Sequence, residues 1–536
     1  MDTTYDAIIV GAGHNGLAAA ITLAEAGFSV LVLEAADEAG GALRSGELTV
    51  PGHIHDLFAT NLNLFLGSSF YATHADGLAR HGFAPATSAQ PFASAFPDAR
   101  ALGVTTDLER TLDELRAHES RDAEGWHRLD RLFERVAPTL FGLYGARAPS
   151  WPMARAGLQG LRALGVTGGA ELARLLLSSI RELVDGYLET EEAKALVAPW
   201  GLHLDFGPDV AGGAVFPFLE AFSDQRSGIA VARGGASRLV AALVALLRHH
   251  GGDVRTSSRV TRVITSGGRA VGVELADGER VRASRAVLAS VTPHALVEDL
   301  LSDHDIPSPT RRALLDYRFG PATMMVHLAL SGPVPWAAGP RWTEFAYVHL
   351  APYLDDLATT YADAMAGRLP EEPLLVVGQT SSVDPTRAPP GGHVVWVQVR
   401  ALPRRIAADR RGRLAGLSWD DAAEDYANRV MEKFERYAPG VSELVIGRAV
   451  LSPADLARHD VNLVGGDSLT GSMHLRQNFL LRPAWGMSGY RTGVAGLWLI
   501  GAATWPGAGL NAVSGYRAGA AVVRDARRSR RQSRRH

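Results

Sequence analysis

The chain has 536 residues, 46% of them hydrophobic and 21% charged, with a formal net charge of −3 at pH 7, and this length favours two or three domain-sized cores. It contains no cysteine, which excludes disulfides, thiolate metal sites, iron–sulfur clusters and the redox dithiol of disulfide reductases. No apolar run reaches the roughly 18 residues that a membrane-spanning helix needs, so we expect a cytoplasmic protein.

Residues 1–34 begin with the pattern of a buried strand, a glycine-rich turn and a helix. Residues 7–10 form a continuous apolar run, as in the central strand of a parallel sheet. Gly11, Gly13 and Gly16 follow with the GxGxxG spacing that lets a dinucleotide pyrophosphate approach the start of a helix. We expect this turn to hold such a pyrophosphate; the alternative is a glycine-rich turn in another kind of α/β protein.

A second predicted strand, residues 29–33, ends in Glu34, where a carboxylate can bind a ribose hydroxyl. The pair Gly40 and Gly41 would bring backbone close to the cofactor a second time, and Arg44 is placed to reach a phosphate. The alternative for this segment is a surface turn with a solvated arginine.

The middle of the chain predicts two further units. Residues 105–195 have helical periodicity and show no legible chemistry. Residues 233–290 predict a helix, a strand pair and a further strand, which we expect to complete the cofactor sheet. A second, antiparallel sheet, the expected substrate domain, is predicted from strands at 323–331, 374–379 and 393–400 and a helix at 420–437.

The C-terminal elements repeat the order of the N-terminus without a GxGxxG. Residues 496–500 predict a strand, 501–509 a glycine-rich loop and 510–524 a helix. The start of such a helix would stabilise a ring that becomes negative on reduction, as a flavin does, by roughly 0.3–1 kcal/mol. The alternative is a terminal helix with a glycine-rich entry.

Residues 524–536 hold seven arginines and one aspartate. We expect a disordered, solvated tail, with contact to an anionic membrane surface as the alternative. Because the other arginines are scattered along the chain, we expect no nucleic-acid partner.

Several of these segments together resemble the phytoene desaturase-type flavoproteins, and among them the branch usually called pyridine nucleotide-disulphide oxidoreductase domain-containing protein 2. The resemblance is carried by residues 10–17, Gly40 and Gly41, 233–235, 465–467, 477–483 and 501–509. It implies FAD as cofactor and an α/β fold, with a glutathione-reductase-like Rossmann domain built from discontinuous segments and an inserted α+β substrate domain. We place the FAD-binding domain at 1–75, 228–300 and 490–523, and the substrate domain at 76–227 and 301–489.

Transferred position by position, the resemblance implies the contacts of FAD. The diphosphate would lie at the first glycine turn, the adenosine ribose at Glu34, the adenine near Val260, and the isoalloxazine between residues 40–44 and the start of the last helix. The expected cofactor-binding residues are Gly11, Ala12, Gly13, His14, Asn15, Gly16, Glu34, Gly41, Ala42, Arg44, Val260, Gly501, Gly509, Leu510, Asn511 and Ala512. The chain departs from many relatives in having Ala42 and Leu43 before Arg44, and Trp505 where a histidine precedes Pro-Gly.

The resemblance implies hydrogen removal, addition or rearrangement on carbon–carbon bonds of an apolar, isoprenoid- or polyene-like substrate. The sequence shows no second dinucleotide turn, so we expect oxygen or a quinone as electron acceptor. No catalytic residue is assigned, and no metal site is expected. The candidates to line the substrate pocket are His53, His55, His474, Arg482 and Trp505.

Two alternatives share this fold. Flavin amine oxidases use a lysine that holds a water at the flavin, whereas this chain has only Lys194 and Lys433, both in expected surface helices. The GDP-dissociation inhibitors of small GTPases are non-catalytic binders of lipidated partners and need no complete FAD fingerprint.

Overall fold

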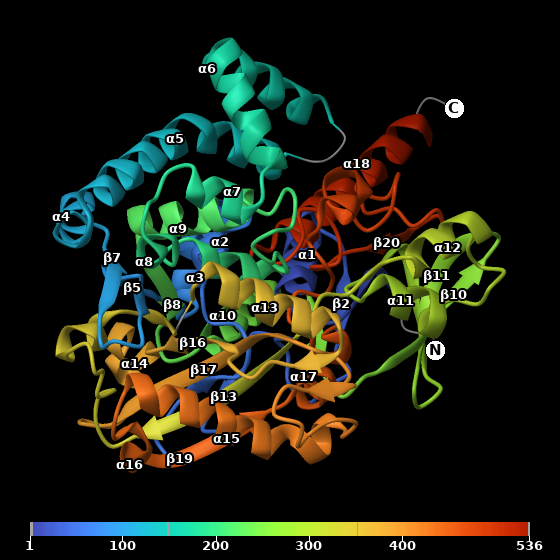
Figure 1. Cartoon of the computed structure of the whole chain (residues 1–536). Helices are drawn as coiled ribbons and strands as arrows, with labels where there is room; N and C mark the ends of the chain where they lie inside the picture. Colours follow the sequence, from blue (N-terminus) through green and yellow to red (C-terminus); the bar gives the residue numbers. More distant parts are fainter. Residues whose placement is uncertain (1–3, 147–149, 351, 534–536) are drawn as a thin grey trace.

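The computed structural model describes residues 4–146, 150–350 and 352–533. Two seven-stranded sheets, each covered by helices, form its core (Figure 1). Each sheet collects strands from distant parts of the chain, so neither corresponds to one continuous segment.

The first sheet has the strand order β10-β11-β12-β1-β2-β9, with β20 paired to β12. Its strands are β1 (Thr4–Val10), β2 (Val30–Leu33), β9 (Asp253–Arg255), β10 (Val260–Ser266), β11 (Arg269–Leu275), β12 (Arg280–Ala289) and β20 (Leu497–Leu499). Strand β1 lies parallel to both β2 and β12, and β20 lies parallel to β12. The prediction that distant segments complete the sheet begun by the N-terminus is confirmed.

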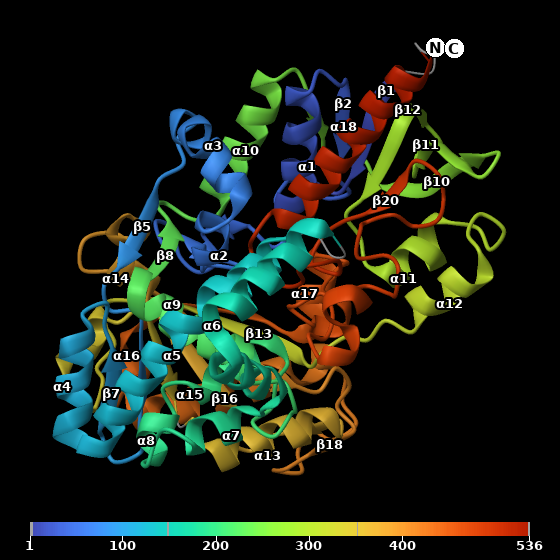
Figure 2. The same cartoon turned by 90° about the horizontal axis from the view of Figure 1, so that it is seen from above.

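Both faces of this sheet are buried, as the apolar run of β1 predicts. On one face Ile9 and Val32 pack in a cluster with helices α1 (His14–Glu25) and α10 (Ser237–His249). Helix α18 (Val513–Ser533) packs against α1 so closely that a Cβ on Gly515 would lie 1.8 Å from the carbonyl oxygen of Asn15. The first and last helices therefore lie side by side (Figure 2).

The second sheet has the strand order β19-β13-β17-β16-β14-β6-β7. Its strands are β6 (Phe92–Ala95), β7 (Ala101–Val104), β13 (Ala322–Leu330), β14 (Tyr347–Leu350), β16 (Leu374–Gly378), β17 (His393–Leu402) and β19 (Val445–Leu451). All pairs are antiparallel except β14 with β6. The three strands predicted here correspond to β13, β16 and β17, and helix α15 (Trp419–Tyr437) covers one face.

Helices dominate the region between β7 and β8, as predicted. They are α4 (Leu108–His118), α5 (Ser120–Gly145), α6 (Trp151–Leu177), α7 (Ile180–Asp185), α8 (Glu191–Lys194), η1 (Ala198–Leu204) and α9 (Val215–Ser227). Helix α9 and the cluster around it pack on the face of the second sheet opposite α15.

Shorter elements connect these units. The remaining strands are β3 (Ser45–Gly46), β4 (His55–Asp56), β5 (Pro85–Ser88), β8 (Ile229–Ala232), β15 (Arg368–Leu369) and β18 (Ala408–Asp409). The remaining helices are α2 (Asn63–Leu66), α3 (Ser69–Arg80), α11 (Pro293–Ala295), α12 (Ser308–Leu315), α13 (Leu354–Met365), α14 (Thr380–Val383), α16 (Val441–Leu444) and α17 (Pro453–His459). The helical turns are η2 (Leu296–Leu300), η3 (Pro340–Glu344), η4 (Pro385–Arg387), η5 (Val464–Gly466), η6 (Leu475–Gln477) and η7 (Phe479–Leu481).

The basic C-terminal segment differs from the prediction. Helix α18 does not end near residue 524 but continues to Ser533, so the expectation of a disordered tail is wrong for residues 524–533. This segment contains no glycine or proline, and its arginines and alanine favour helix. Asp525 also pairs with Arg491, which ties this helical turn to the preceding loop. Residues 534–536 lie outside the described residues.

Each helix in the described part of the chain is too short or too polar to cross a membrane.

Candidate functional site

The N-terminal glycine turn has the geometry that its sequence predicts. Gly11 has φ of +96°, which favours glycine, and a Cβ on Gly16 would lie 2.0 Å from the Gly11 carbonyl oxygen. Gly13 is different, because its φ is −68° and a Cβ there would meet no atom within 4 Å. Glycine at position 13 therefore leaves open space at the start of α1 that the folded chain does not itself use.

Glu34 lies at the end of β2 and supports this turn directly. Its Oε2 accepts a hydrogen bond from the backbone N–H of Ala12 at 2.7 Å, and its Oε1 accepts one from Ala36 at 2.9 Å. Each carboxylate oxygen keeps a further lone pair. Glu34 can therefore hold the glycine turn and accept a hydrogen bond from a ligand at the same time.

The second glycine pair packs onto the first turn. The N–H of Gly40 donates to the Ala12 carbonyl at 3.1 Å, and a Cβ on Gly41 would lie 3.4 Å from the Gly13 Cα. Arg44 donates through Nη2 to the Glu38 carbonyl at 3.1 Å, while its buried Nε has no partner among the described residues. A partly exposed guanidinium with a free donor beside a helix start is suited to an anionic ligand.

The C-terminal loop meets the same region from the other side. Asn511 caps helix α18, since its Oδ1 accepts from the Val513 N–H at 3.0 Å. Gly509 has φ of +100°, and the Gly501 N–H donates to Ser514 Oγ at 3.0 Å. The side chain of Asn15 accepts from the Gly515 N–H at 3.2 Å, so the first and last helices are joined at their starts.

These segments open into one large cavity of about 1380 Å³. Small-molecule pockets usually measure about 300–1,000 Å³, so this cavity has room for a cofactor and a second molecule. Of the predicted cofactor-binding residues, those that line it are Gly11, Gly13, His14, Asn15, Glu34, Gly41, Ala42, Arg44, Val260, Gly501, Gly509, Leu510 and Asn511. Ala12, Gly16 and Ala512 lie behind this surface and do not line it.

None of the five candidate pocket residues lines the cavity, so that expectation is wrong for each of them. His53 lies near the β3–β4 hairpin and contacts the Pro51 carbonyl through Nδ1 at 3.3 Å. His55 is fully buried and bonded to Thr49 through Nε2 at 2.8 Å, and burial lowers its pKa to about 3. Both histidines are therefore packed inside the protein.

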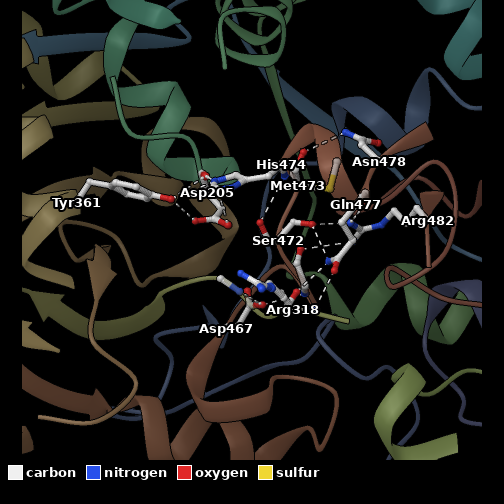
Figure 3. A network of polar contacts seen from close by, with 12 residues as sticks. Asp205, Arg318, Tyr361, Asp467, Ser472, Met473, His474, Gln477, Asn478 and Arg482 are labelled. Carbon is white, nitrogen blue, oxygen red and sulfur yellow. Dashed lines mark hydrogen bonds and ion pairs between the residues drawn. The ribbon is translucent and has the colours of Figure 1, made fainter. Parts of the chain in front are cut away.

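The other three candidates hold loops together. Arg482 is fully buried and donates to the backbone carbonyls of Ser472 at 2.7 Å and Ala502 at 2.9 Å. His474 bonds through Nε2 to the Asp205 carbonyl at 2.7 Å, within the polar network of Figure 3. Trp505 is fully buried and donates to the Ala146 carbonyl at 3.0 Å. It does not narrow the cavity directly; Tyr144, which stacks on it, is the lining residue.

The cavity contains ionisable residues that the sequence did not single out. Glu220 and Asp224 lie one helical turn apart on α9, and both line it. Their partners are neutral amides, with Asn63 donating to Asp224 Oδ1 at 2.7 Å and Asn61 to Glu220 Oε1 at 3.4 Å. Burial raises the pKa of Glu220 to about 7. It also raises the pKa of Asp224 well above the usual value of an aspartate. The signal for them was two acids spaced by four in an otherwise apolar helix.

Asp460 also faces the glycine turns, from the loop after α17. It lines the cavity, and its Oδ2 would lie 3.4 Å from a Cβ on Gly41. Burial raises the pKa of Asp460, and the nearby negative charge of Glu34 raises it further. No local pattern in the sequence indicated this placement.

Neither lysine of the chain lines the cavity. Lys194 pairs with Asp185 at 2.8 Å and Glu191 at 2.9 Å. Helix α15 has an exposed face, as predicted, but Lys433 lies on its buried face and donates to the Pro373 carbonyl at 2.8 Å.

Known proteins are similar to this chain in sequence and in fold. The family model described as flavin containing amine oxidoreductase matches residues 16–464. Pyridine nucleotide-disulfide oxidoreductase domain-containing protein 2 of Rattus norvegicus is 29% identical over 97% of this chain and 94% of that protein. A phytoene desaturase (lycopene-forming) of Paracoccus sp. is 25% identical over 95% of each chain. An oxidoreductase from Methanosarcina mazei has a similar fold, with a TM-score of 0.62 at 16% identity over 97% of this chain and 99% of that one.

The resemblance to phytoene desaturase-type proteins is thereby confirmed. The open space at Gly13, the unpartnered Nε of Arg44 and the cavity size fit the dinucleotide cofactor of such enzymes. The chain belongs to the flavin-containing amine oxidoreductase family and is an FAD-dependent oxidoreductase.

Proposed function

We propose that this protein transfers hydrogen between FAD and a carbon–carbon bond of an apolar, isoprenoid- or polyene-like substrate. The net reaction is desaturation, saturation or isomerisation, and the electron acceptor is oxygen or a quinone. The observation that carries the proposal is the group of apolar and aromatic side chains that line the cavity away from the glycine turns, between a few polar ones. The lining there includes Leu204, Phe216, Leu219, Met325, Trp396 and Met473.

The proposed FAD position follows the two glycine turns. The diphosphate lies at Gly11 and Gly13, the adenosine ribose at Glu34, and the adenine near Val260. The isoalloxazine lies between residues 40–44 and the start of α18. The open space at Gly13 and the free Nε of Arg44 support this arrangement.

The proposed domains follow the two sheets. We assign 1–75, 228–300 and 490–523 to a glutathione-reductase-like FAD-binding domain, and 76–227 and 301–489 to an inserted substrate domain. Support comes from the first sheet, which draws its strands from residues 4–33, 253–289 and 497–499.

The chain contributes position and a dry environment to this reaction. When bound, FAD supplies the hydride acceptor. The apolar wall of the cavity excludes water and holds a substrate C–H bond within the ~3–3.5 Å that transfer requires. The start of α18 lies at the cavity, where Asn511 and Val513 line it, and the positive end of the helix dipole there would stabilise developing negative charge.

Amine oxidation is the competing reaction, and the positions of the lysines argue against it. Lys194 and Lys433 both lie away from the cavity, so no lysine is available to hold a water beside the flavin. A non-catalytic binder of a lipidated partner is the second alternative. Bound FAD in the purified protein, together with reduction of that FAD by a substrate, would exclude this non-catalytic alternative.

A peripheral membrane contact is part of the proposal. Helix α6 exposes several large apolar side chains, including Trp151, Leu161 and Val166. Both α6 and the basic end of α18 project from the upper side of the molecule in Figure 1. Such a combination of apolar and basic groups favours an anionic lipid surface, which would also deliver an apolar substrate.

Anaerobic mixing of the purified holoprotein with substrate tests the function. Phytoene in mixed micelles should bleach the absorbance of the oxidised flavin, whereas putrescine and benzylamine should leave it unchanged. Rapid bleaching by an amine, with phytoene and other polyenes inert, would contradict the proposal and favour the amine oxidase alternative.

A further inference from the structure

One wall of the cavity carries a single charged group. The second sheet contributes residues from strands β13, β14 and β17, which are Thr323, Met325, Tyr347, Trp396, Gln398 and Arg400. Trp396, Gln398 and Arg400 alternate along β17, so all three point to the same face of the sheet. Arg400 is the only ionised residue of this wall.

The hydrogen bonds of Arg400 use neutral acceptors. Its Nε donates to Gln398 Oε1 at 2.7 Å, and its Nη1 donates to Ser468 Oγ at 3.1 Å and to the His203 carbonyl at 3.4 Å. Among the residues that the structure describes, no carboxylate pairs with Arg400, and its Nη2 has no protein partner. One face of the guanidinium is therefore free toward the cavity.

Buried arginines in this protein are compensated. Arg387 lies 2.8 Å from Asp56 Oδ2, and Arg429 lies 2.8 Å from Asp409 Oδ1. Arg482, which has no carboxylate partner, donates instead to several backbone carbonyls. Arg400 has no carboxylate partner among the described residues and donates to a single backbone carbonyl, that of His203.

Of the ionisable neighbours of Arg400, Asp467 supplies negative charge, which raises the pKa of Arg400. Asp467 accepts hydrogen bonds from the backbone N–H groups of Gly320, Leu469 and Gly471 rather than from Arg400. Burial lowers the pKa of His203 well below its usual value, so its ring is neutral. Burial raises the pKa of Tyr347, so its phenol is also neutral. Burial lowers the pKa of Arg400 to about 10, which still leaves the guanidinium positive. Arg400 is only partly buried, because it faces the cavity, and its direct hydrogen-bond partners are neutral. An anion bound at Nη2 would give it a direct counter-charge.

Hydroxyl groups lie beside the free guanidinium. Ser468 Oγ, which accepts from Arg400, lies 3.1 Å from Thr323 Oγ1, and both residues line the cavity. An oxyanion placed at Nη2 would meet a planar cationic donor next to two hydroxyls, which is a common arrangement for carboxylate or phosphate recognition.

Acidic side chains lie on another wall. Glu220 and Asp224 face the cavity from α9 and offer no positive charge to an anion on that side. An elongated ligand with one anionic end would therefore bind in one direction, with that end at β17.

We propose that Arg400 binds an anionic group, a carboxylate or a phosphate, carried at one end of an otherwise apolar substrate. This inference rests on the proposed function, because it names the class of the same substrate. The substrate is then an amphiphile, and Arg400 determines which of its carbon–carbon bonds reaches the flavin.

Calorimetric titration of the FAD-loaded protein tests the inference with three C15 isoprenoid probes that differ only in the end group. The probes are farnesol, farnesoic acid and farnesyl monophosphate, measured at pH 7.5 against wild type, Arg400→Gln, Arg400→Lys and Arg436→Gln. Arg436 is an exposed arginine on α15 and does not line the cavity, so its replacement controls for net charge.

Wild type should bind one of the two anionic probes about 10- to 100-fold more tightly than farnesol. Arg400→Gln should remove that preference while changing farnesol affinity less than about threefold, and Arg436→Gln should behave as wild type. Arg400→Lys should keep part of the preference, because it retains the charge without the planar fork. The preferred anionic probe identifies carboxylate or phosphate as the end group.

Three results would count against the inference. Equal binding of farnesol and both anionic probes by wild type would refute it while leaving the proposed function intact. Equal loss of all three probes in both Arg400 variants would assign Arg400 to the structure of the cavity wall. Failure of every probe to bind wild type would count against the proposed apolar substrate as well.

Discussion

Replacing Gly13 by alanine separates what the fold requires from what the cofactor requires. In the structure a Cβ at this position meets no protein atom within 4 Å, and φ of −68° suits any residue. The change should stabilise the folded apoprotein by about 0.4–1 kcal/mol, because alanine lowers the conformational entropy of the unfolded chain. It should also weaken the N-cap of α1 by a similar amount. We therefore expect the free energy of unfolding of the apoprotein to change by less than about 1 kcal/mol.

FAD binding should respond very differently to the same methyl group. If the diphosphate occupies the open space, an added methyl overpacks the contact and costs about 1–3 kcal/mol, or about 5- to 150-fold in Kd. The measurements are urea unfolding of the apoprotein and calorimetric titration with FAD.

Gly16→Ala is the matched control, because its Cβ would lie 2.0 Å from the Gly11 carbonyl oxygen. That clash lies within the protein, so we expect Gly16→Ala to destabilise the apoprotein by about 3 kcal/mol or more. Full FAD affinity in Gly13→Ala would show that the diphosphate lies elsewhere. Strong destabilisation of the Gly13→Ala apoprotein would show that the fold itself needs this glycine.

Two further predictions concern charged parts of the protein. The pKa of Glu220 is raised to about 7, so its contribution to stability is complete below pH 4 and is lost as pH rises through 7. The reference protein is the Glu220→Gln, Asp224→Asn double variant, which lacks both carboxyl groups. Between pH 5.5 and 8.5 the unfolding free energy of the wild-type apoprotein should fall by about 2 kcal/mol relative to that of the double variant. The same pH dependence of both proteins in urea unfolding would contradict this prediction. Each arginine of the C-terminal segment would contribute up to about 1 kcal/mol to binding of an anionic membrane. Truncation after Val523 should therefore release the protein from anionic vesicles in co-sedimentation at low salt. Its low affinity for neutral vesicles should not change. Unchanged binding to anionic vesicles would remove the tail from the membrane proposal.

The part of the site built from backbone could be predicted from the sequence. Gly11, Gly13 and Gly16 are close in the chain, and their spacing alone determines the strand, turn and helix that the structure shows. Glu34 could be predicted for the same reason, because a parallel neighbouring strand ends at the same edge of the sheet. Of the second sheet, strands β13, β16 and β17 could be predicted from their apolar residues, whereas β6, β7, β14 and β19 were missed. Nothing in the sequence indicated which face of the sheet lines the cavity.

The side chains of the cavity could not be predicted in the same way. Arg482 and His474 occur in a glycine-rich segment that resembles a site, yet they bind backbone carbonyls of neighbouring loops. A sequence does not reveal which carbonyls remain free for such a side chain. Arg400 and Asp460 have ordinary surroundings in the sequence, and only the pairing of distant strands and loops brings them to the cavity.

This contrast follows from the way that the two ends of the cavity recognise their ligands. At the cofactor end, the contacts are made by helix starts and glycine turns, so their sequence must keep fixed spacing whatever the substrate is. At the substrate end, recognition depends on a few polar side chains in an apolar wall, and each can be replaced without altering the backbone. Arg400 and the acidic pair on α9 lie on different walls of this end. Substitution of such ionisable side chains can therefore change substrate choice while the flavin end stays the same, which is how one fold can host different activities.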